Sequence, residues 1–334
     1  MLFRSKAIIL KCRQGSRFHF GEFAREQSTA LFHTGDYIHS DVIFAAFISS
    51  LAQICPEKTD VFREYFQQGN IRFSSGFYAI EYNKKTIFLL PKPTVLNIYP
   101  TDNPKKFKKI QFLSKGVWEK GVAPDKWFSD NSPCISPNEK SIFLKEEIGS
   151  DALFPLSQKV DIQKVKARGA EDKDNLYVQT DLILQGNENY AVHWYFLAET
   201  NLKDEDEKLF YRIIGLLAAN GIGGERSTGC GNIESVEYQD FEFQTNQPSD
   251  DQVALSLVFP KEEGMNVCKY YQTKFRGGMC LGLEKRLPVA TALLEGAVMS
   301  EKVKPDVLDF SQNEKKYWKY SGDFFLPLPL SFNP

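Results

Sequence analysis

The sequence predicts an α+β fold made of two ferredoxin-like halves with an excursion between them. Strand-like and helical patterns follow the order strand, helix, hairpin, helix over residues 1–132, which is the order of a βαββαβ ferredoxin-like unit. Strand-like runs and an amphipathic helix return over residues 176–334. The intervening residues 133–175 are polar and charged and lack clear periodicity. A structureless stretch of this length is typical of a functional excursion or of a disordered linker, and we expect the excursion.

In the first half, residues 5–10 predict a strand and residues 13–39 a long polar loop. A helix is expected from Ser40, whose hydroxyl can cap it, to the residue before Pro56. Its apolar face is formed by side chains at helical spacing: Ile43, Phe44, Phe47, Ile48, Leu51 and Ile54. The following segments, 71–82 and 86–90, predict two strands. A basic helix is expected over 105–118.

In the second half, the β-rich runs 176–184 and 190–198 flank the polar turn Gln-Gly-Asn-Glu, which predicts a hairpin. An amphipathic helix with an acidic first turn is expected over 204–219. Strands are expected over 233–243 and 253–259.

The bulk composition bounds the class of protein. The 334 residues are 42% hydrophobic and 25% charged, as in soluble globular proteins, and no apolar run approaches a membrane span. The six cysteines contain no Cys-x-x-Cys pair, which favours reduced thiols in the cytoplasm over a zinc site or a disulfide framework. Because the net charge is only −2, any contact with nucleic acid is expected from local basic patches.

The segment 221–231 carries the strongest functional signal, because five of its eleven residues are glycine. Glycines allow positive φ angles and close approach of a ligand, so the run can offer backbone N–H groups to phosphates. It is not a nucleotide-triphosphate loop, since no Lys-[Ser/Thr] closes it and a helix precedes it. A strand does not lead into it, which excludes a dinucleotide fold. The spacing alone leaves two interpretations open, a phosphate cradle and a structural turn.

Five segments in the same order resemble one family. They are Arg17-Phe-His-Phe-Gly-Glu22 with Ile38-His-Ser-Asp-Val-Ile-Phe-Ala-Ala46, Ile71-Arg-Phe-Ser-Ser-Gly-Phe77 leading to Phe88-Leu-Leu-Pro-Lys-Pro93, the glycine-rich run, Tyr-Gln-Thr-Lys-Phe-Arg-Gly-Gly over 271–278, and Tyr-Trp-Lys-Tyr-Ser-Gly-Asp-Phe-Phe-Leu-Pro over 317–327. Together they are similar to the RAMP superfamily of CRISPR-associated proteins, and within it to the Cas5-like fourth subunit of the type III-A Csm effector complex. The segment 160–168 departs from the family pattern, because the arginine expected there is displaced.

The resemblance implies two RRM-like domains, 1–132 and 176–334, with a thumb-like hairpin from 133–175. It implies a non-catalytic subunit that binds the 5′ repeat-derived handle of the crRNA and docks to the large polymerase-like subunit and to the backbone RAMP subunit. No cofactor, metal or membrane partner is expected. The expected RNA-binding residues are Gly221, Gly223, Gly224, Arg226, Ser227, Thr228, Gly229, Gly231, His19, Ser40, Lys164, Lys166 and Arg168.

An enzymatic alternative stays open at this point. Related RAMP endoribonucleases use a histidine near the first helix, and His19, His33 and His39 all lie in the loop before it. A histidine near its ordinary pKa can act as a general base on a ribose 2′-OH. We expect these side chains to pack or to bind RNA without chemistry.

Overall fold

The computed structural model describes residues 2–23, 31–100, 104–149, 155–165, 176–278, 288–311 and 316–333. Within those ranges no helix has the length and apolarity needed to span a membrane. The two longest helices are α1 (Ser40–Ile54) and α5 (Asp204–Asn220). Short 3-10 turns also occur, at Pro56–Lys58, Thr94–Ile98, Pro124–Lys126, Arg226–Thr228, Glu262–Val267 and Leu330–Phe332.

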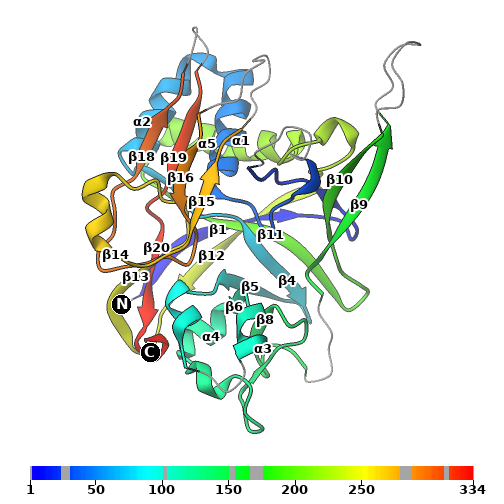
Figure 1. The fold of residues 1–334 in the computed structure, drawn as a ribbon. Helices are drawn as coiled ribbons and strands as arrows, with labels where there is room; N and C mark the ends of the chain where they lie inside the picture. The colour runs from blue at the N-terminus through cyan, green and yellow to red at the C-terminus, as the bar shows by residue number, and fades with distance from the viewer. Residues whose placement is uncertain are drawn as a thin grey trace.

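The centre of the molecule is a sheet in which four antiparallel strands lie in the order β12-β1-β11-β4 (Figure 1). These strands are β1 (Phe3–Lys11), β4 (Phe77–Tyr82), β11 (Tyr190–Thr200) and β12 (Ser235–Phe243). Helices α1 and α5 pack together on one side of this sheet. Followed along the chain, β1, α1, β4, β11, α5 and β12 trace one βαββαβ unit.

This unit differs from the expected division into halves at 132 and 176, because it takes its strands from both sides of that division. The reason lies in β1, where residues 7–10 are all buried. A continuous buried run requires cover on both faces and a paired neighbour on each edge. The neighbours are β11 and β12, which are distant in sequence.

A second helix, α2 (Thr59–Gln67), follows α1 and was not expected from the sequence. Pro56 ends α1 but is tolerated in the first turn of the next helical segment, because the N–H that proline lacks is unpaired there anyway. Phe62 and Phe66 anchor α2 by packing against the α1 ring of Phe47.

The strand expected over 71–82 is divided into β3 (Ile71–Phe73) and β4, and the strand expected over 86–90 is confirmed as β5 (Lys85–Pro91). The tight turn between β4 and β5 places both Asn83 and Lys84 at positive φ, +48° and +61°. Positive φ at both central residues is the hairpin geometry that follows the twist of the strands.

The single basic helix expected over 105–118 is wrong. The chain forms α3 (Pro104–Lys109), then the strand β6 (Phe112–Ser114), then α4 (Lys115–Lys120). All three residues of β6 are buried, and the strand pairs with β5. Tertiary pairing therefore overrides the helical pattern, and the Ser114 hydroxyl caps α4 by accepting the N–H of Val117 at 3.3 Å.

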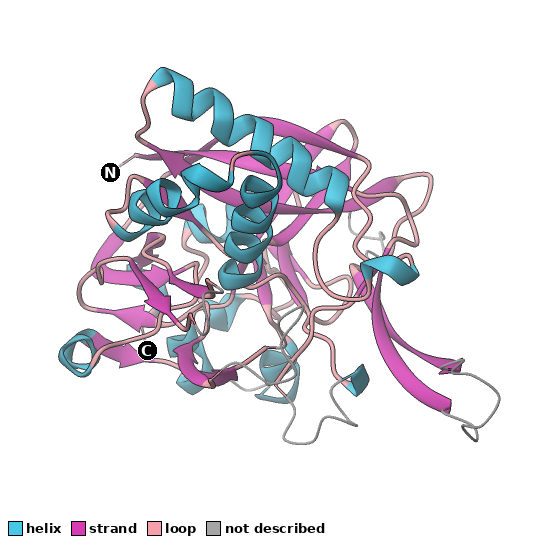
Figure 2. Ribbon diagram, turned by 90° about the horizontal axis from the view of Figure 1, so that it is seen from above, coloured by secondary structure: helices cyan, strands magenta, loops and turns pink. Residues whose placement is uncertain are grey.

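Part of the excursion expected over residues 133–175 belongs to the central sheet. β7 (Cys134–Ile135) and β8 (Ser141–Leu144) extend the central sheet beyond β6. What projects is a two-stranded ribbon of β9 (Ser157–Val165) and β10 (Leu176–Leu184), seen in Figures 1 and 2.

The expected hairpin of 176–184 with 190–198 is also wrong. β10 pairs with β9 and with β2 (Arg17–Phe18), whereas β11 enters the central sheet. Within the described residues, an isolated bridge between Gly186, in the polar turn, and Ala191 of β11 lies beside the junction of β10 and β11. The polar turn between them therefore passes the chain from one sheet to another.

The C-terminal segment adds a four-stranded sheet and two hairpins. The sheet contains β13 (Pro248–Ala254), β14 (Cys268–Tyr270), β17 (Val298–Met299) and β20 (Phe325–Pro329). One hairpin pairs β15 (Thr273–Arg276) with β16 (Ala290–Leu293), and the other pairs β18 (Asp306–Asp309) with β19 (Trp318–Ser321).

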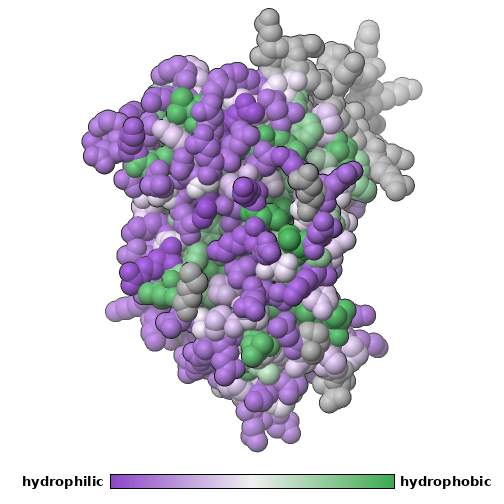
Figure 3. All heavy atoms as spheres, turned by 90° about the vertical axis from the view of Figure 1, so that its left-hand side faces the viewer, coloured by the Kyte–Doolittle hydropathy of each residue, from purple (hydrophilic) through white to green (hydrophobic). Residues whose placement is uncertain are grey.

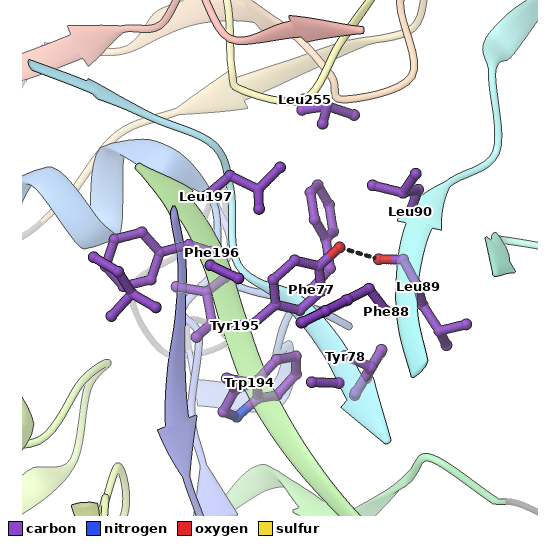
Figure 4. Packing of buried hydrophobic residues seen from close by; sticks show 14 of the residues in the cluster. Phe77, Tyr78, Phe88, Leu89, Leu90, Trp194, Tyr195, Phe196, Leu197 and Leu255 are labelled. Atoms are coloured by element: carbon purple, nitrogen blue, oxygen red, sulfur yellow. Dashed lines mark hydrogen bonds between the residues drawn. The ribbon is translucent and has the colours of Figure 1, made fainter. Parts of the chain in front are cut away.

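One large aromatic-rich core supports both sides of the central sheet. Figure 4 shows Phe77, Tyr78, Phe88, Trp194 and Tyr195 packed where β4, β5 and β11 run side by side. The Tyr195 hydroxyl donates to the carbonyl of Leu89 at 2.8 Å, so this polar atom is satisfied inside the core. The outer face seen in Figure 3 is mainly hydrophilic, with small separate hydrophobic patches.

Candidate RNA-binding site

The glycine-rich loop begins where α5 ends and is folded back on itself. The N–H of Ile222 donates to the carbonyl of Gly231 at 3.0 Å, which closes the loop. The loop is then anchored to the strand β2 region, since Gly231 N–H donates to the Arg17 carbonyl at 2.7 Å and Gly224 N–H to the His19 carbonyl at 2.8 Å. Some of the backbone N–H groups that were expected to bind phosphate are therefore used in hydrogen bonds that hold the loop together.

The glycines of the loop differ in how much room each leaves for a side chain. A Cβ on Gly231 would lie 2.3 Å from the Ile222 carbonyl oxygen, and one on Gly221 would lie 2.6 Å from the Gly231 carbonyl oxygen. Gly223 is restricted in the same way by the His19 carbonyl at 2.8 Å. Gly229 also has a positive φ, +90°, but faces open space. The structural-turn interpretation thus explains Gly221, Gly223 and Gly231, and leaves the exposed part of the loop for a ligand.

Three consecutive backbone N–H groups, those of Glu225, Arg226 and Ser227, make no hydrogen bond within the described residues. They sit where the backbone passes from a left-handed residue, Glu225 at φ +57°, into a 3-10 turn. Successive N–H groups at such a change of hand converge and favour an anion. Arg226, Ser227 and Thr228 are exposed, so a ligand can reach this turn.

Three cations surround the turn. Lys164, on the ribbon strand β9, places its Nζ 3.0 Å from the Thr228 Oγ1. Arg17 donates to the Thr228 carbonyl at 3.3 Å. The Arg226 guanidinium lies 3.3 Å from the carbonyl of Asn220, at the end of α5, where a positive charge is favoured by the helix dipole. The ribbon and the glycine loop are therefore joined directly.

A buried polar cluster holds these cations in place. Asp181 is fully buried and pairs with the Arg17 Nε at 3.2 Å. Gln179, also fully buried, accepts from the Lys164 Nζ at 2.6 Å. Burial raises the pKa of the Cys230 thiol beside them, so the thiol stays protonated at neutral pH. β10 thus places a neutral amide, Gln179, and a carboxylate, Asp181, against the cations of the site.

His19 lies beside the loop but is 3% exposed. Its Nδ1 is 3.0 Å from the Thr180 carbonyl, which can only accept, so Nδ1 carries the proton in this contact. The ring thereby links β10 to the segment that anchors the loop. Among the other histidines of this segment, His33 is exposed, and His39 is buried against Glu295 with Nδ1 3.0 Å from Oε1.

Ser40 is not brought to the loop. It is fully buried, and its hydroxyl accepts the N–H of Leu257 at 3.0 Å. Nor does it cap α1, because the N-cap position is His39. The expected RNA contact and the expected cap at Ser40 are both replaced by a hydrogen bond to the C-terminal segment. Lys166 and Arg168, the two other expected ribbon cations, lie outside the described residues.

Two of the segments that carried the resemblance meet in a separate buried cluster. Arg276 forms two hydrogen bonds to the Asp41 carboxylate, at 3.0 and 2.8 Å, and both side chains are at most 7% exposed. Burial disfavours the Asp41 charge, but Arg276 and Lys319 outweigh it and hold the pKa of this carboxyl below its ordinary value. This cluster ties α1 to the C-terminal hairpins.

Two other charged runs within the described residues, in the first turn of α5 and on α3, have different surroundings. Within the acidic first turn of α5, Asp206 pairs with Lys58 at 3.0 Å and accepts from the Tyr65 hydroxyl at 2.7 Å. In the described ranges, no three His, Cys, Asp or Glu residues gather in a way that could hold a metal ion. The lysines of α3 are exposed around the buried Phe107, as on a solvated helix face.

Three residues of the candidate site were not expected from the sequence: Arg17, Asp181 and Glu225. Arg17 stands in the same motif as His19 and was available as a signal. Asp181 and Glu225 gave no signal, because their roles depend on the pairing of β9, β10 and β2.

Comparison with known proteins finds matches to one kind of protein. The family model described as CRISPR Csm4 C-terminal domain matches residues 247–328. A protein of Methanocaldococcus jannaschii, described as CRISPR system Cms protein Csm4, is 29% identical and aligns over 92% of this chain and 90% of its own length.

Two solved structures share the fold. The first is a Csm3–Csm4 subcomplex of the type III-A CRISPR-Cas interference complex, with a TM-score of 0.66, 24% identity, and coverage of 97% of this chain and 99% of that one. The second is a Csm1–Csm4 cassette in complex with cA4, with a TM-score of 0.57, 17% identity, and coverage of 98% and 99%.

The mixed α+β architecture with large sheets is thus shared with a chain of the Csm3–Csm4 subcomplex. The family model and the full-length relative are both described as Csm4, and the structural match lies in a subcomplex that contains Csm4.

Proposed function

We propose that this chain is a non-catalytic subunit of a type III-A effector complex and that it binds the 5′ repeat-derived handle of the crRNA. The carrying observation is the exposed turn of the glycine loop, where three N–H groups without partners in the described residues lie among Lys164, Arg17 and Arg226. A single-stranded RNA presents phosphates to such a combination of backbone donors and cations.

Lys164 offers the sharpest test of this proposal, because a control lysine exists on the same strand. Lys159 also belongs to β9 but pairs with Asp36 at 3.2 Å, away from the loop. We expect Lys164→Met to weaken binding of a 5′-handle RNA about five- to tenfold and to lower the salt dependence by about one phosphate contact. Lys159→Met should leave both quantities near the wild-type values.

Fluorescence anisotropy with labelled handle RNA, measured at several salt concentrations, gives both numbers. Equal effects of the two substitutions would mean that only net charge matters, and the cradle would be rejected. Arg226→Ala should also weaken binding, although the residue additionally stabilises the end of α5. Substitution of Gly223 is not a clean probe, because a side chain there meets the His19 carbonyl and disturbs the loop itself.

The proposal includes a bridging role between the large polymerase-like subunit and the backbone RAMP subunit. It is supported by the similar chains solved in a Csm1–Csm4 cassette and in a Csm3–Csm4 subcomplex. We expect this chain to co-purify with each of the two subunits separately and to be required for their joint recovery. Joint recovery in its absence would contradict the bridge.

We propose further that the chain does not cleave RNA. The support is geometric: His19 and His39 are buried and engaged with Thr180 and Glu295. Incubation with a CRISPR repeat RNA without metal should give no product with a 2′,3′-cyclic phosphate. Cleavage that disappears in His33→Ala, His19→Ala or His39→Ala would instead establish the endoribonuclease alternative.

A further inference from the structure

Glu225 is the single acidic residue of the glycine-rich run 221–231, and it occupies the exposed turn. Its φ of +57° lies in the left-handed region, which is unfavourable for a residue with a Cβ. Glycine or asparagine would fit this backbone with less strain. An acidic side chain held in such a conformation calls for an electrostatic explanation.

The explanation lies in the ribbon. The Glu225 Oε2 is 3.7 Å from the Lys164 Nζ, and the Lys164 side chain is only 15% exposed. The other two contacts of this ammonium, Gln179 and Thr228, are neutral. Among the described residues, Glu225 is therefore the anion that pairs with Lys164.

A carboxylate oxygen and a phosphate oxygen both accept a charge-assisted hydrogen bond from an ammonium group. The Glu225 carboxylate sits on the same turn as the open N–H groups of residues 225–227. An RNA phosphate that enters this turn meets Lys164 and must share or replace its present counter-charge.

We propose that Glu225 is the resident counter-anion of the RNA site, holding in the RNA-free protein the place at Lys164 that a phosphate oxygen of the RNA takes on binding. This inference rests on the proposed handle-binding function. Binding is then an exchange of anions at a preformed cation. The Lys164 ammonium has an anionic partner both in the RNA-free and in the RNA-bound protein. The ribbon therefore stays in contact with the loop in both states.

The exchange predicts that removing the carboxylate tightens RNA binding. Glu225→Gln keeps the size of the side chain and removes its charge, so the phosphate no longer competes for Lys164. We expect the Kd for handle RNA to fall about fivefold, which corresponds to the strength of one partly exposed ion pair.

A matched control separates this local effect from a general loss of negative charge. Glu234 follows the loop closely in sequence but pairs with Arg13 at 3.0 Å. Glu234→Gln therefore removes the same charge without freeing Lys164. A second control is the double variant Glu225→Gln/Lys164→Met, in which the gain should vanish because the cation for which the anions compete is gone.

The measurement is anisotropy with the full chain and handle RNA at fixed salt, with thermal melting to show that each variant is folded. A fivefold gain in Glu225→Gln alone, absent in the double variant, supports the exchange. An unchanged or higher Kd in Glu225→Gln, or an equal gain in Glu234→Gln, overturns it while leaving the proposed function intact. Failure of the wild-type chain to bind handle RNA rejects the function and this inference together.

Discussion

Gly221 and Gly231 each lie so close to a backbone carbonyl of the loop that neither position has room for a side chain. The closest backbone oxygens would lie 2.6 and 2.3 Å from an added Cβ. Gly229 has an equally positive φ but no neighbour within 4 Å. The sequence showed that glycine dominates this run, yet it could not show which glycines build the loop and which face open space.

This difference can be measured by alanine substitution. Gly231→Ala should lower the free energy of unfolding by about 2–5 kcal/mol, because it adds both a backbone clash and a left-handed alanine. Gly229→Ala adds only the left-handed alanine, so we expect a loss of about 1–2 kcal/mol. Denaturant titration of both variants compares the two losses. Equal losses would contradict the closed geometry of the loop.

Asp41 and Arg276 form a buried pair whose partners come from α1 and β15. Asp41→Asn leaves Arg276 buried without a carboxylate, so we expect a loss of about 3–5 kcal/mol in unfolding free energy. The double variant with Arg276→Met should lose less than the sum of the two single variants, since neither charge is then left alone. Additive losses would mean that the two residues act independently.

The same pair predicts a pH dependence. The pKa of Asp41 is lower in the folded protein than in the unfolded chain, so the folded state binds the proton less readily. The stabilisation is therefore complete above the unfolded pKa of about 4 and is lost as the pH falls below it. Melting temperatures of wild type and Asp41→Asn should differ most above about pH 5 and converge toward about pH 2. A gap that widens in acid would contradict this sign.

At the scale of elements, the local sequence pattern predicted the secondary structure of the strongly periodic segments. It failed where the secondary structure depends on pairing with a distant strand. The helices α1 and α5 and the strands β1, β5 and β12 appear close to the expected positions. The basic segment became α3, β6 and α4 because β5 and β8 offer β6 partners on both edges. β10 left the expected hairpin because β2 and β9 enclose it. Neither event leaves a local signal.

The ribbon of β9 and β10 can be shortened without changing the pairing of its two strands. Its register is regular from Ser157 opposite Leu184 to Val165 opposite Leu176. Replacing residues 166–175 by Asn-Gly should therefore close a two-residue hairpin without a register shift. We expect an unchanged melting temperature and a handle Kd within about threefold of wild type, because Lys164 and the glycine loop remain.

In the assembled complex the same deletion should disturb the position of the first guide nucleotide more than the affinity for the handle. Chemical probing of the guide RNA in complexes with and without residues 166–175 measures this directly. A complete loss of handle binding would show that the tip, and not the loop, carries the affinity.

At the scale of the whole molecule, the proposed RNA site is assembled from segments far apart in sequence. The loop of residues 221–231 rests on Arg17 and His19, and the ribbon supplies Lys164. The sequence predicted the α+β class and the position of the glycine loop. It did not predict that one βαββαβ unit spans both halves, because antiparallel pairing of β1 with β11 and β12 depends on contacts about two hundred residues apart.

The central claim, that the glycine loop and the adjoining ribbon hold the crRNA handle, is tested most directly by photo-crosslinking. Handle RNA carrying 4-thiouridine at successive positions is bound to the complete effector complex, irradiated, and the crosslinked peptides are identified by mass spectrometry. The structure predicts crosslinks to residues 221–231, to the Arg17–His19 segment and to β9 near Lys164. Crosslinks confined to other surfaces of this chain, such as the basic helix α3, would contradict it.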